Sequence, residues 1–225
     1  MTLHRIQDKS DAMKEEILQK SLTLFLKHGI REMSNQKLVD WLGISTKTIY
    51  KYFQSKEGLL EEALYLYHNT EYEKLLNLSN EQNAACHFFE IWQIAVEMEY
   101  QINQSFYRDL EYYYPDLARK VEKVIAPKFE QHFLSVINRG VAQGAFRNDI
   151  LPELALRSVF VLHRASVANE AFTKLGLSAT DLLLQTTANY IRGLCTPEGL
   201  KALEKHIQTL AISESAENPT VTDQP

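Results

Sequence analysis

The stretch GISTKTIYKYFQSKE, residues 43–57, has the pattern of a tight turn followed by a short helix with polar and basic residues at its start. Gly43 can adopt the positive φ that ends a preceding helix, and Ser45 can accept a hydrogen bond from a free N–H at the start of the next one. Ser55 is placed to cap a further helix. Recognition helices present such side chains to base edges, and helix N-termini and lysines bind phosphates. The stretch therefore predicts a DNA-reading helix.

Two more helices are predicted before this stretch. Ser34 can cap a short helix that ends at Gly43 and buries Leu38, Val39 and Leu42. Before it, apolar residues recur at steps of three and four until Gly29, which predicts an amphipathic first helix; they are Met13, Ile17, Leu18, Leu22, Phe25 and Leu26. We expect Phe53 to pack into the core of these three helices with Phe25 and Leu22.

Three segments together resemble the N-terminal domain of TetR-family transcriptional regulators: FLKHG (25–29), SNQKLVDWLGIS (34–45) and TIYKYFQSKEGLL (48–60). The resemblance covers about residues 11–60. The chain departs from the family pattern at Asn35 and in the run 39–42. The resemblance implies an N-terminal helix-turn-helix domain that binds double-stranded operator DNA, and a larger C-terminal helical domain for ligand binding and dimerisation.

The resemblance and helix geometry together predict the DNA contacts. The residues expected to hold phosphates are Ser34, Thr48, Tyr50 and Lys56, and those expected to face the groove are Thr46, Lys47 and Lys51. Ser45 and Tyr52 complete the predicted DNA-binding set. Residues 1–60 hold ten Lys and Arg against seven Asp and Glu, although the whole chain has a net charge of −5. The more positive end of the chain is therefore the predicted DNA-binding end.

The rest of the chain is predicted to be helical, which gives an all-α protein. No run of alternating β-branched residues appears, and Gly and Pro mark helix ends. The expected helices cover residues 55–78, 81–103, 105–113, 115–143, 152–175, 179–195 and 197–210. We expect a DNA-binding domain over residues 1–54 and an effector-binding and dimerisation domain over residues 55–212. The polar residues 213–225 are predicted to form a disordered tail.

The resemblance implies that the helices over 152–175 and 179–195 form a four-helix bundle with a second copy of the chain. Both helices are apolar over more of their circumference than one core requires. On this interpretation Leu183 and Ile191 face the partner. The alternative is that both helices are buried inside one monomer.

Aromatic residues are concentrated between residues 88 and 114. Such side chains line apolar pockets that contain a few polar groups, and the resemblance places the effector among these helices. The residues predicted to contact a largely apolar effector are Trp92, Met98, Phe106, Tyr107, Phe160 and His163. The same residues can instead fill the core, and this alternative stays open.

Other functions have little support in the sequence. There is no Gly-x-Ser-x-Gly, phosphate-binding Gly-rich loop or His-Glu-x-x-His motif, so we expect no enzyme activity, metal or cofactor. Cys86 and Cys195 are expected to be reduced. The first residues lack the apolar core of a signal peptide, and no segment is long and apolar enough to span a membrane, which predicts a cytoplasmic protein. The leading hypothesis is a repressor that an apolar effector releases from a palindromic operator. The alternative is an all-helical ligand-binding or interaction module without DNA-binding activity.

Overall fold

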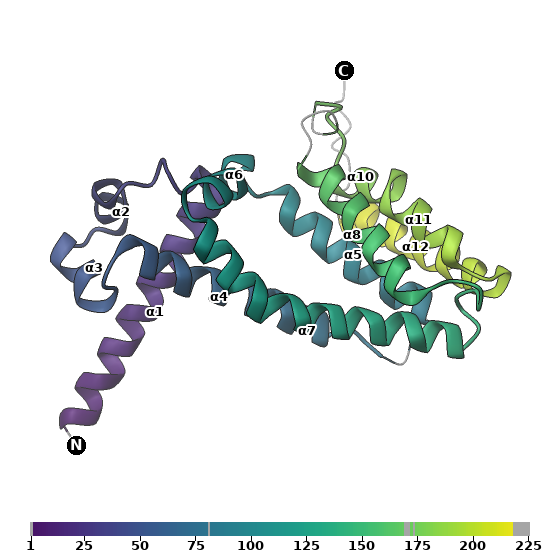
Figure 1. Cartoon of the computed structure of the whole chain (residues 1–225), viewed down its shortest axis with the longest axis horizontal. Coiled ribbons are helices and arrows are strands. Elements are labelled where there is room, and N and C mark those ends of the chain that lie inside the picture. The colour runs from purple at the N-terminus through teal and green to yellow at the C-terminus, as the bar shows by residue number, and fades with distance from the viewer. Residues whose placement is uncertain (1, 81, 169–171, 173, 218–225) are drawn as a thin grey trace. The chain divides into compact units, whose positions relative to one another are not determined.

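The computed structural model describes residues 2–80, 82–168, 172 and 174–217. Within these ranges the regular elements are helices, apart from one isolated antiparallel bridge between Phe146 and Cys195, which confirms the predicted all-α class (Figure 1). The helices are α1 (Thr2–His28), α2 (Asn35–Leu42), α3 (Thr46–Tyr52), α4 (Lys56–Leu76), α5 (Ala84–Tyr100), α6 (Gln104–Tyr113), α7 (Pro115–Ala142), α8 (Pro152–Ala168), α10 (Ala179–Gln185), α11 (Thr187–Leu194) and α12 (Pro197–Glu217).

The helices are grouped in two compact units. Unit 1 comprises Met1–Leu76 and Gln101–Phe129, and unit 2 comprises Asn77–Tyr100 and Glu130–Pro225. Helix α7 contributes residues to both units. The packing unit that contains the helix-turn-helix is thus larger than residues 1–54. The functional boundary after residue 54 remains a prediction.

The caps of the helix-turn-helix lie where the sequence predicts them. The Ser34 hydroxyl accepts a hydrogen bond from the Lys37 N–H at 3.2 Å and begins α2. Gly43 ends α2 with a φ of 65°, a conformation that is unfavourable for residues other than glycine. The Ser45 hydroxyl accepts from the Thr48 N–H at 3.1 Å and begins α3. Two side chains and one backbone conformation therefore fix the turn and the start of the recognition helix.

The core of unit 1 joins the helix-turn-helix to α1 and α4. Helix α1 packs against α4, α2 and α6. The Phe53 ring is 2% exposed and the Phe25 ring is fully buried, which confirms the predicted core position of both residues. The other buried apolar residues of these helices include Ile17, Leu18, Leu38, Val39, Ile49, Leu59, Leu60, Ala63 and Leu64.

Helix α6 closes unit 1 where α1 ends. Gly29 has a φ of 84°, which other residues rarely adopt, and a Cβ at this position would lie 2.2 Å from the Ser105 hydroxyl, so this position favours glycine. The Asp109 carboxylate accepts a hydrogen bond from the Arg31 N–H at 2.8 Å, and the Asn103 N–H donates to the Leu26 carbonyl at 2.9 Å. Helix α6 thereby holds the backbone that leads from α1 into the helix-turn-helix.

Unit 2 is built around α5, which packs against α8, α10, α11 and α12. The predicted single helix over residues 179–195 is wrong, because the chain breaks between α10 and α11. Thr186 has φ −121° and ψ −89°, and its hydroxyl donates to the Leu182 carbonyl at 2.6 Å. A threonine that bonds to its own helix in this way competes with the regular backbone pattern and bends the helix.

The expected partner-facing role of Leu183 and Ile191 is also wrong. Leu183 is 1% exposed and Ile191 is fully buried within the single chain. The additional apolar side chains of this segment are buried within the monomer, because other helices of the same unit cover α10 and α11. The alternative of burial inside the monomer therefore holds for these two residues.

The C-terminal helix is longer than predicted. Helix α12 runs through Glu217, so it includes the first part of the predicted tail, and residues 218–225 lie outside the described residues. The predicted continuation of α8 to residue 175 likewise falls partly on residues 169–171 and 173, which are not described. Over the described ranges, no helix has the length and apolar character needed to cross a membrane.

Candidate DNA-binding surface and effector region

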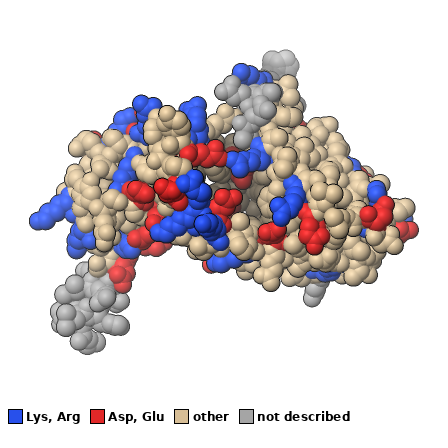
Figure 2. Space-filling model, in the orientation of Figure 1, with Lys and Arg blue, Asp and Glu red and all other residues tan. Residues whose placement is uncertain are grey.

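Helix α3 presents a polar and basic face to solvent. Ile49 is 2% exposed and points into the core of unit 1, which leaves the opposite side of this short helix free. Thr46, Lys47 and Lys51 are exposed on that side, and Tyr50 is 47% exposed. Figure 2 shows Lys and Arg side chains at the surface of the region that α2 and α3 occupy in Figure 1. This arrangement suits a helix that enters a DNA groove.

Side-chain contacts order this face. The hydroxyls of Ser45 and Thr48 are 2.8 Å apart, and the Lys51 ammonium lies 5.0 Å from the centre of the Tyr52 ring. The Asn35 side-chain amide donates to the Tyr50 hydroxyl at 2.8 Å. The predicted DNA-binding residues of α3 therefore lie together on one surface, and Asn35, which the sequence prediction left out, joins them.

The cations near this face differ in their surroundings. The Lys37 ammonium pairs with the Glu32 carboxylate at 2.9 Å, and this hydrogen bond lowers the pKa of Glu32. By contrast, Lys47 has no carboxylate partner among the residues that the structure describes. The charge of Lys47 is therefore available to a DNA phosphate or base.

Lys56 lies in a different setting from the other predicted contacts. Its ammonium donates to the Ile30 carbonyl at 2.6 Å and lies 5.9 Å from the centre of the Phe25 ring. Burial lowers the pKa of Lys56, and the nearby Asp109 carboxylate opposes that change. Lys56 thus supports the end of α1, a role that the sequence did not indicate. One of the three ammonium protons serves that bond.

Three of the six predicted effector residues meet in unit 2. The Trp92 ring, 1% exposed, lies 5.1 Å from the Phe160 ring and 5.0 Å from the His163 ring, measured between centroids. Met98 lies on the same helix as Trp92 and is half-buried. The other two predicted residues, Phe106 and Tyr107, lie on α6 in unit 1, where Phe106 is buried.

Polar atoms are buried within this aromatic cluster. The His163 Nε2 and the Glu99 Oε2 are 3.2 Å apart, which is within ion-pair range, although the geometry is not that of a hydrogen bond. Of the described side chains, none offers a hydrogen bond to the Trp92 indole N–H. Buried polar groups of this kind are normally satisfied by protein, water or ligand. The cluster therefore combines apolar rings with polar groups able to orient a small molecule.

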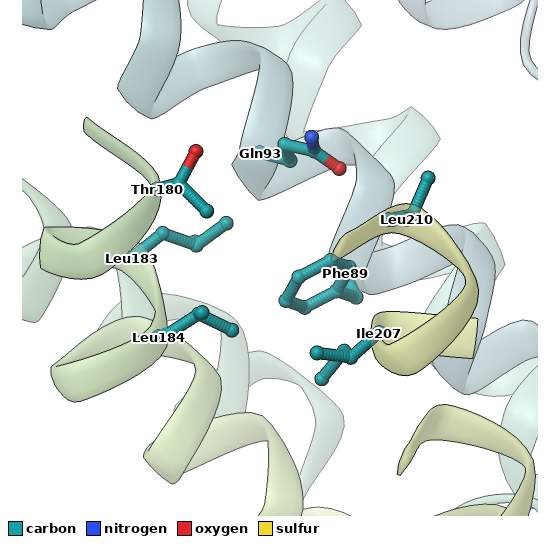
Figure 3. Close-up of a pocket in the computed structure, with 7 residues that line it drawn as sticks. All are labelled: Phe89, Gln93, Thr180, Leu183, Leu184, Ile207 and Leu210. Atoms are coloured by element: carbon teal, nitrogen blue, oxygen red, sulfur yellow. The ribbon is translucent and has the colours of Figure 1, made fainter. Parts of the chain in front are cut away.

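A second feature of unit 2 is a small cavity on another side of α5. It has a volume of about 40 Å³. Figure 3 shows its side chains, which come from α5, α10 and α12: Phe89, Gln93, Thr180, Leu183, Leu184, Ile207 and Leu210. Pockets for drug-sized ligands usually measure about 300–1,000 Å³. In this conformation the cavity could admit only one small group of a ligand. The sequence prediction missed it and assigned one of its lining residues, Leu183, to a dimer face.

Unit 2 also contains a buried basic cluster that the sequence did not indicate. Arg139 Nη2 and His87 Nδ1 are 2.6 Å apart, and Arg139 Nη1 donates to the Asn80 carbonyl at 3.0 Å. The His87 side chain is fully buried. Burial, followed by the charges of Arg139 and His132, lowers the pKa of His87 to about 4. His87 is therefore neutral at pH 7 and accepts the arginine proton at Nδ1.

The cysteines give no sign of redox or metal chemistry. Cys86 and Cys195 are both free and buried. Burial raises the pKa of Cys86, and raises that of Cys195 to about 12, so both thiols stay protonated and weakly reactive. Across the described part of the chain, no three His, Cys, Asp or Glu residues are grouped so that they could hold a metal ion.

The helix-turn-helix segment matches a known family model. Residues 17–63 match the model of the bacterial regulatory proteins of the tetR family. This range begins in α1 and ends in α4, so it contains the complete α2, turn and α3 unit.

Known proteins resemble the chain over most of its length. The HTH-type transcriptional repressor KstR2 of Rhodococcus jostii (strain RHA1) is 24% identical over 195 residues, which cover 82% of this chain and 92% of the repressor. A putative transcriptional regulator from Saccharomonospora viridis, solved in complex with choline, superposes with a TM-score of 0.70 at 18% identity, over 81% of this chain and 96% of that one. The regulator FadR from Bacillus subtilis, solved with stearoyl-CoA, gives a TM-score of 0.63 at 13% identity, over 79% of this chain and 96% of the FadR chain.

Proposed function

Because the chain belongs to the TetR family of bacterial regulatory proteins, we propose that it represses transcription from a palindromic operator and leaves that operator when a small apolar effector binds. One observation carries the proposal. Helix α3 starts at a capped turn, buries Ile49 and exposes Thr46, Lys47, Tyr50 and Lys51. An operator-binding protein acts in the cytoplasm of a bacterium, where the chromosome lies.

The DNA contacts follow from this exposed face. We assign the groove to Thr46, Lys47 and Lys51. The proposed phosphate contacts are Ser34, Thr48, Tyr50 and Lys56, with Ser45 and Tyr52 ordering the same surface. Lys56 stays in the set because its ammonium has protons beyond the one that it donates to Ile30.

A gel shift with the DNA upstream of the protein's own gene tests the proposal. We expect a specific complex that competitor DNA of unrelated sequence does not displace. If the protein shifts neither this DNA nor any enriched from a random duplex library, it is instead an all-helical ligand-binding or interaction module.

Salt dependence separates the two kinds of lysine. Lys56→Ala should reduce the magnitude of the slope of log K against log salt by about one if its free ammonium protons reach a phosphate, because one fewer counterion is then released. Lys47→Ala, which removes a proposed groove contact, should instead relax the sequence preference of binding. An unchanged slope, together with weaker binding and lower thermal stability, would show that Lys56 acts only through Ile30. Arg108→Ala, which removes an exposed cation of α6, is the control and should leave the slope unchanged.

We propose that two copies of the chain associate through α8. The outer side of this helix and the residue before it expose three large apolar side chains: Leu151 at 62%, Leu154 at 59% and Val161 at 71%. Exposed apolar groups in such a row are typical of interaction surfaces. A two-fold dimer would match a palindromic operator, because its two recognition helices and the two half-sites of the operator are related by the same kind of two-fold axis.

The proposed effector is an apolar small molecule that contacts Trp92, Phe160 and His163, with Met98 on the same helix as Trp92. Support comes from the clustered rings and from the buried indole N–H, which could donate to an oxygen of the ligand. Phe106 and Tyr107 remain predicted contacts, although they belong to unit 1. The choline and stearoyl-CoA complexes of similar folds support ligand binding in general, without defining the ligand here.

A thermal-shift screen of hydrophobic metabolites, run on the wild type and variants, tests this site. A ligand at a hundredfold excess over its dissociation constant should add about 2.7 kcal/mol to the free energy of unfolding. The shift should disappear in Trp92→Ala and His163→Ala and persist in Tyr112→Ala, which removes an exposed aromatic ring of α6. Equal shifts in all four proteins would place the site elsewhere. Release of DNA in the gel shift should follow only from ligands that prefer the non-binding state.

A further inference from the structure

The hydrogen bond between Asn35 and Tyr50 joins the first residue of α2 to α3 across the turn. The Asn35 Nδ2 donates to the Tyr50 hydroxyl at 2.8 Å, and the two residues are fifteen positions apart in the chain. Tyr50 is 47% exposed and Asn35 is half-buried. The pair therefore lies on the proposed DNA-binding face of the chain.

The direction of this bond determines what the tyrosine can do next. A phenolic hydroxyl has one proton to donate, and here its oxygen is already used as an acceptor. The hydroxyl proton of Tyr50 is therefore free to point outward. Accepting one hydrogen bond also strengthens a hydroxyl as a donor, because linked hydrogen bonds polarise one another. Among the described residues, the second proton on the Asn35 amide nitrogen has no acceptor either.

Two neutral donors on one exposed surface match an anionic oxygen of the DNA backbone. Tyrosine and asparagine side chains both bind DNA phosphates, and such contacts fix the position of a protein on the duplex without reading its sequence. Without Asn35, the exposed Tyr50 ring would be free to rotate, and binding would have to immobilise it.

We propose that Asn35 is a positioning residue that orients the Tyr50 hydroxyl toward a DNA phosphate, with its own second amide proton directed to the same phosphodiester. This inference rests on the proposed operator binding. It adds a residue to the contact surface and assigns the direction of the hydrogen bond. Because both donors are uncharged, the contact contributes affinity and register without releasing a counterion.

The test is a double-mutant cycle measured by DNA affinity at several salt concentrations. Tyr50→Phe should weaken binding about tenfold, since it removes a hydrogen bond to a charged group, and Asn35→Ala should weaken it by roughly threefold to tenfold. The double variant should bind slightly more weakly than Tyr50→Phe and clearly better than the product of the two single losses predicts, because the asparagine acts mainly through the hydroxyl and contributes one amide proton of its own. All three lines of log K against log salt should stay parallel to the wild-type line.

Asn35→Asp separates positioning from a purely structural bond. The introduced carboxylate would accept the tyrosine proton, so it would keep a hydrogen bond in the free protein and reverse its direction. DNA affinity should then fall below that of Asn35→Ala, and this further loss should be smaller in a Tyr50→Phe background. Gln36→Ala is the matched control. Its amide donates to Asp40 on the same helix, at 2.8 Å, so affinity should stay at the wild-type value.

Several outcomes would overturn the inference. If Tyr50→Phe binds DNA with wild-type affinity, the Tyr50 hydroxyl does not contact a phosphate. If the losses of the two single variants are fully additive, Asn35 does not position Tyr50. Equal affinity of Asn35→Asp and wild type would show that the pair only stabilises the turn, which a lower melting temperature in Asn35→Ala would accompany. A wild-type protein that binds no duplex DNA would remove the proposed function and this inference together. The other outcomes remove only the inference.

Discussion

Phe53 connects the recognition helix to the rest of unit 1. It directly follows α3, its ring is 2% exposed, and the Lys14 ammonium lies 5.4 Å from the ring centre. Phe53→Ala should destabilise the protein by about 3–5 kcal/mol, because it removes a buried ring and leaves a cavity. Hydrogen exchange should show lost protection in α1, α2 and α3. Full protection of those amides in the variant would contradict the core role, and Tyr112→Ala, which removes an exposed ring of α6, serves as the control.

His87 makes the stability of the protein depend on pH. Its folded-state pKa of about 4 lies below the ordinary value of 6.5, so the unfolded chain takes up the proton first. The contribution of His87 to the free energy of unfolding is complete above pH 6.5 and is lost as the pH falls from about 6.5 to about 4. The melting temperature should decrease over this range. His87→Asn, which keeps an acceptor for Arg139 and cannot titrate, should reduce that decrease, although His132, whose pKa is also lowered, retains part of it.

At the residue scale, the sequence predicts local chemistry well and distant partners poorly. The caps at Ser34 and Ser45 were predictable because each involves a backbone group within three residues. The bond from Lys56 to the Ile30 carbonyl was not, since it depends on how α1 and α4 pack. The contact between Arg139 and His87 was not predictable either, because the two residues lie on different helices and are 52 positions apart in the chain.

At the element scale, the sequence predicted that the segments are helical, but it did not predict which side of each helix is buried. Periodicity predicted apolar helices over 152–175 and 179–195, but it could not show which apolar side is buried in the monomer and which is exposed to solvent. Leu183 and Ile191 are buried in the chain, whereas Leu154 and Val161 are exposed. The break at Thr186 escaped prediction because threonine within a helix is common, and only its bond to Leu182 distinguishes this one.

Charges on α8 and α11 should therefore have different effects. Val161→Glu should convert the proposed dimer to a folded monomer, since the carboxylate would be buried only against a partner. Ile191→Glu should instead unfold unit 2, because that side chain is already fully buried in the monomer. Sedimentation measures the first effect and circular dichroism the second. A Val161→Glu protein that stays dimeric would place the interface on another surface, and Lys201→Glu, on the exposed side of α12, is the control.

At the scale of the whole molecule, a residue on α6 supports the DNA-binding end of unit 1. Asp109 is 6% exposed and accepts the Arg31 N–H at 2.8 Å. Asp109→Ala should destabilise unit 1 by about 1–3 kcal/mol, because a part-buried donor loses its acceptor. The Arg31 amide should exchange faster, and operator affinity should fall. Arg108→Ala, at the neighbouring exposed position, should change neither; unchanged exchange at Arg31 in Asp109→Ala would contradict the role of this bond.

The sequence and family resemblance predicted the class of the molecule and its order of helices. They did not predict that a segment beyond residue 100 packs with the first 76 residues, since no local pattern records contacts so far apart along the chain. For the same reason, the expected effector set combined residues of two compact units: Trp92 lies in unit 2 and Phe106 in unit 1.

The discontinuity of unit 1 limits how the DNA-reading part can be reused. A chimera that fuses residues 1–54 to a foreign sensor would carry α1, α2 and α3 without the carboxylate that holds Arg31 and without the Asn103 N–H that donates to the Leu26 carbonyl. Residues 1–54 therefore do not carry all the contacts that support their own fold. Engineers who transplant them would need to graft α6 along with them, and natural recombination at that point would meet the same barrier.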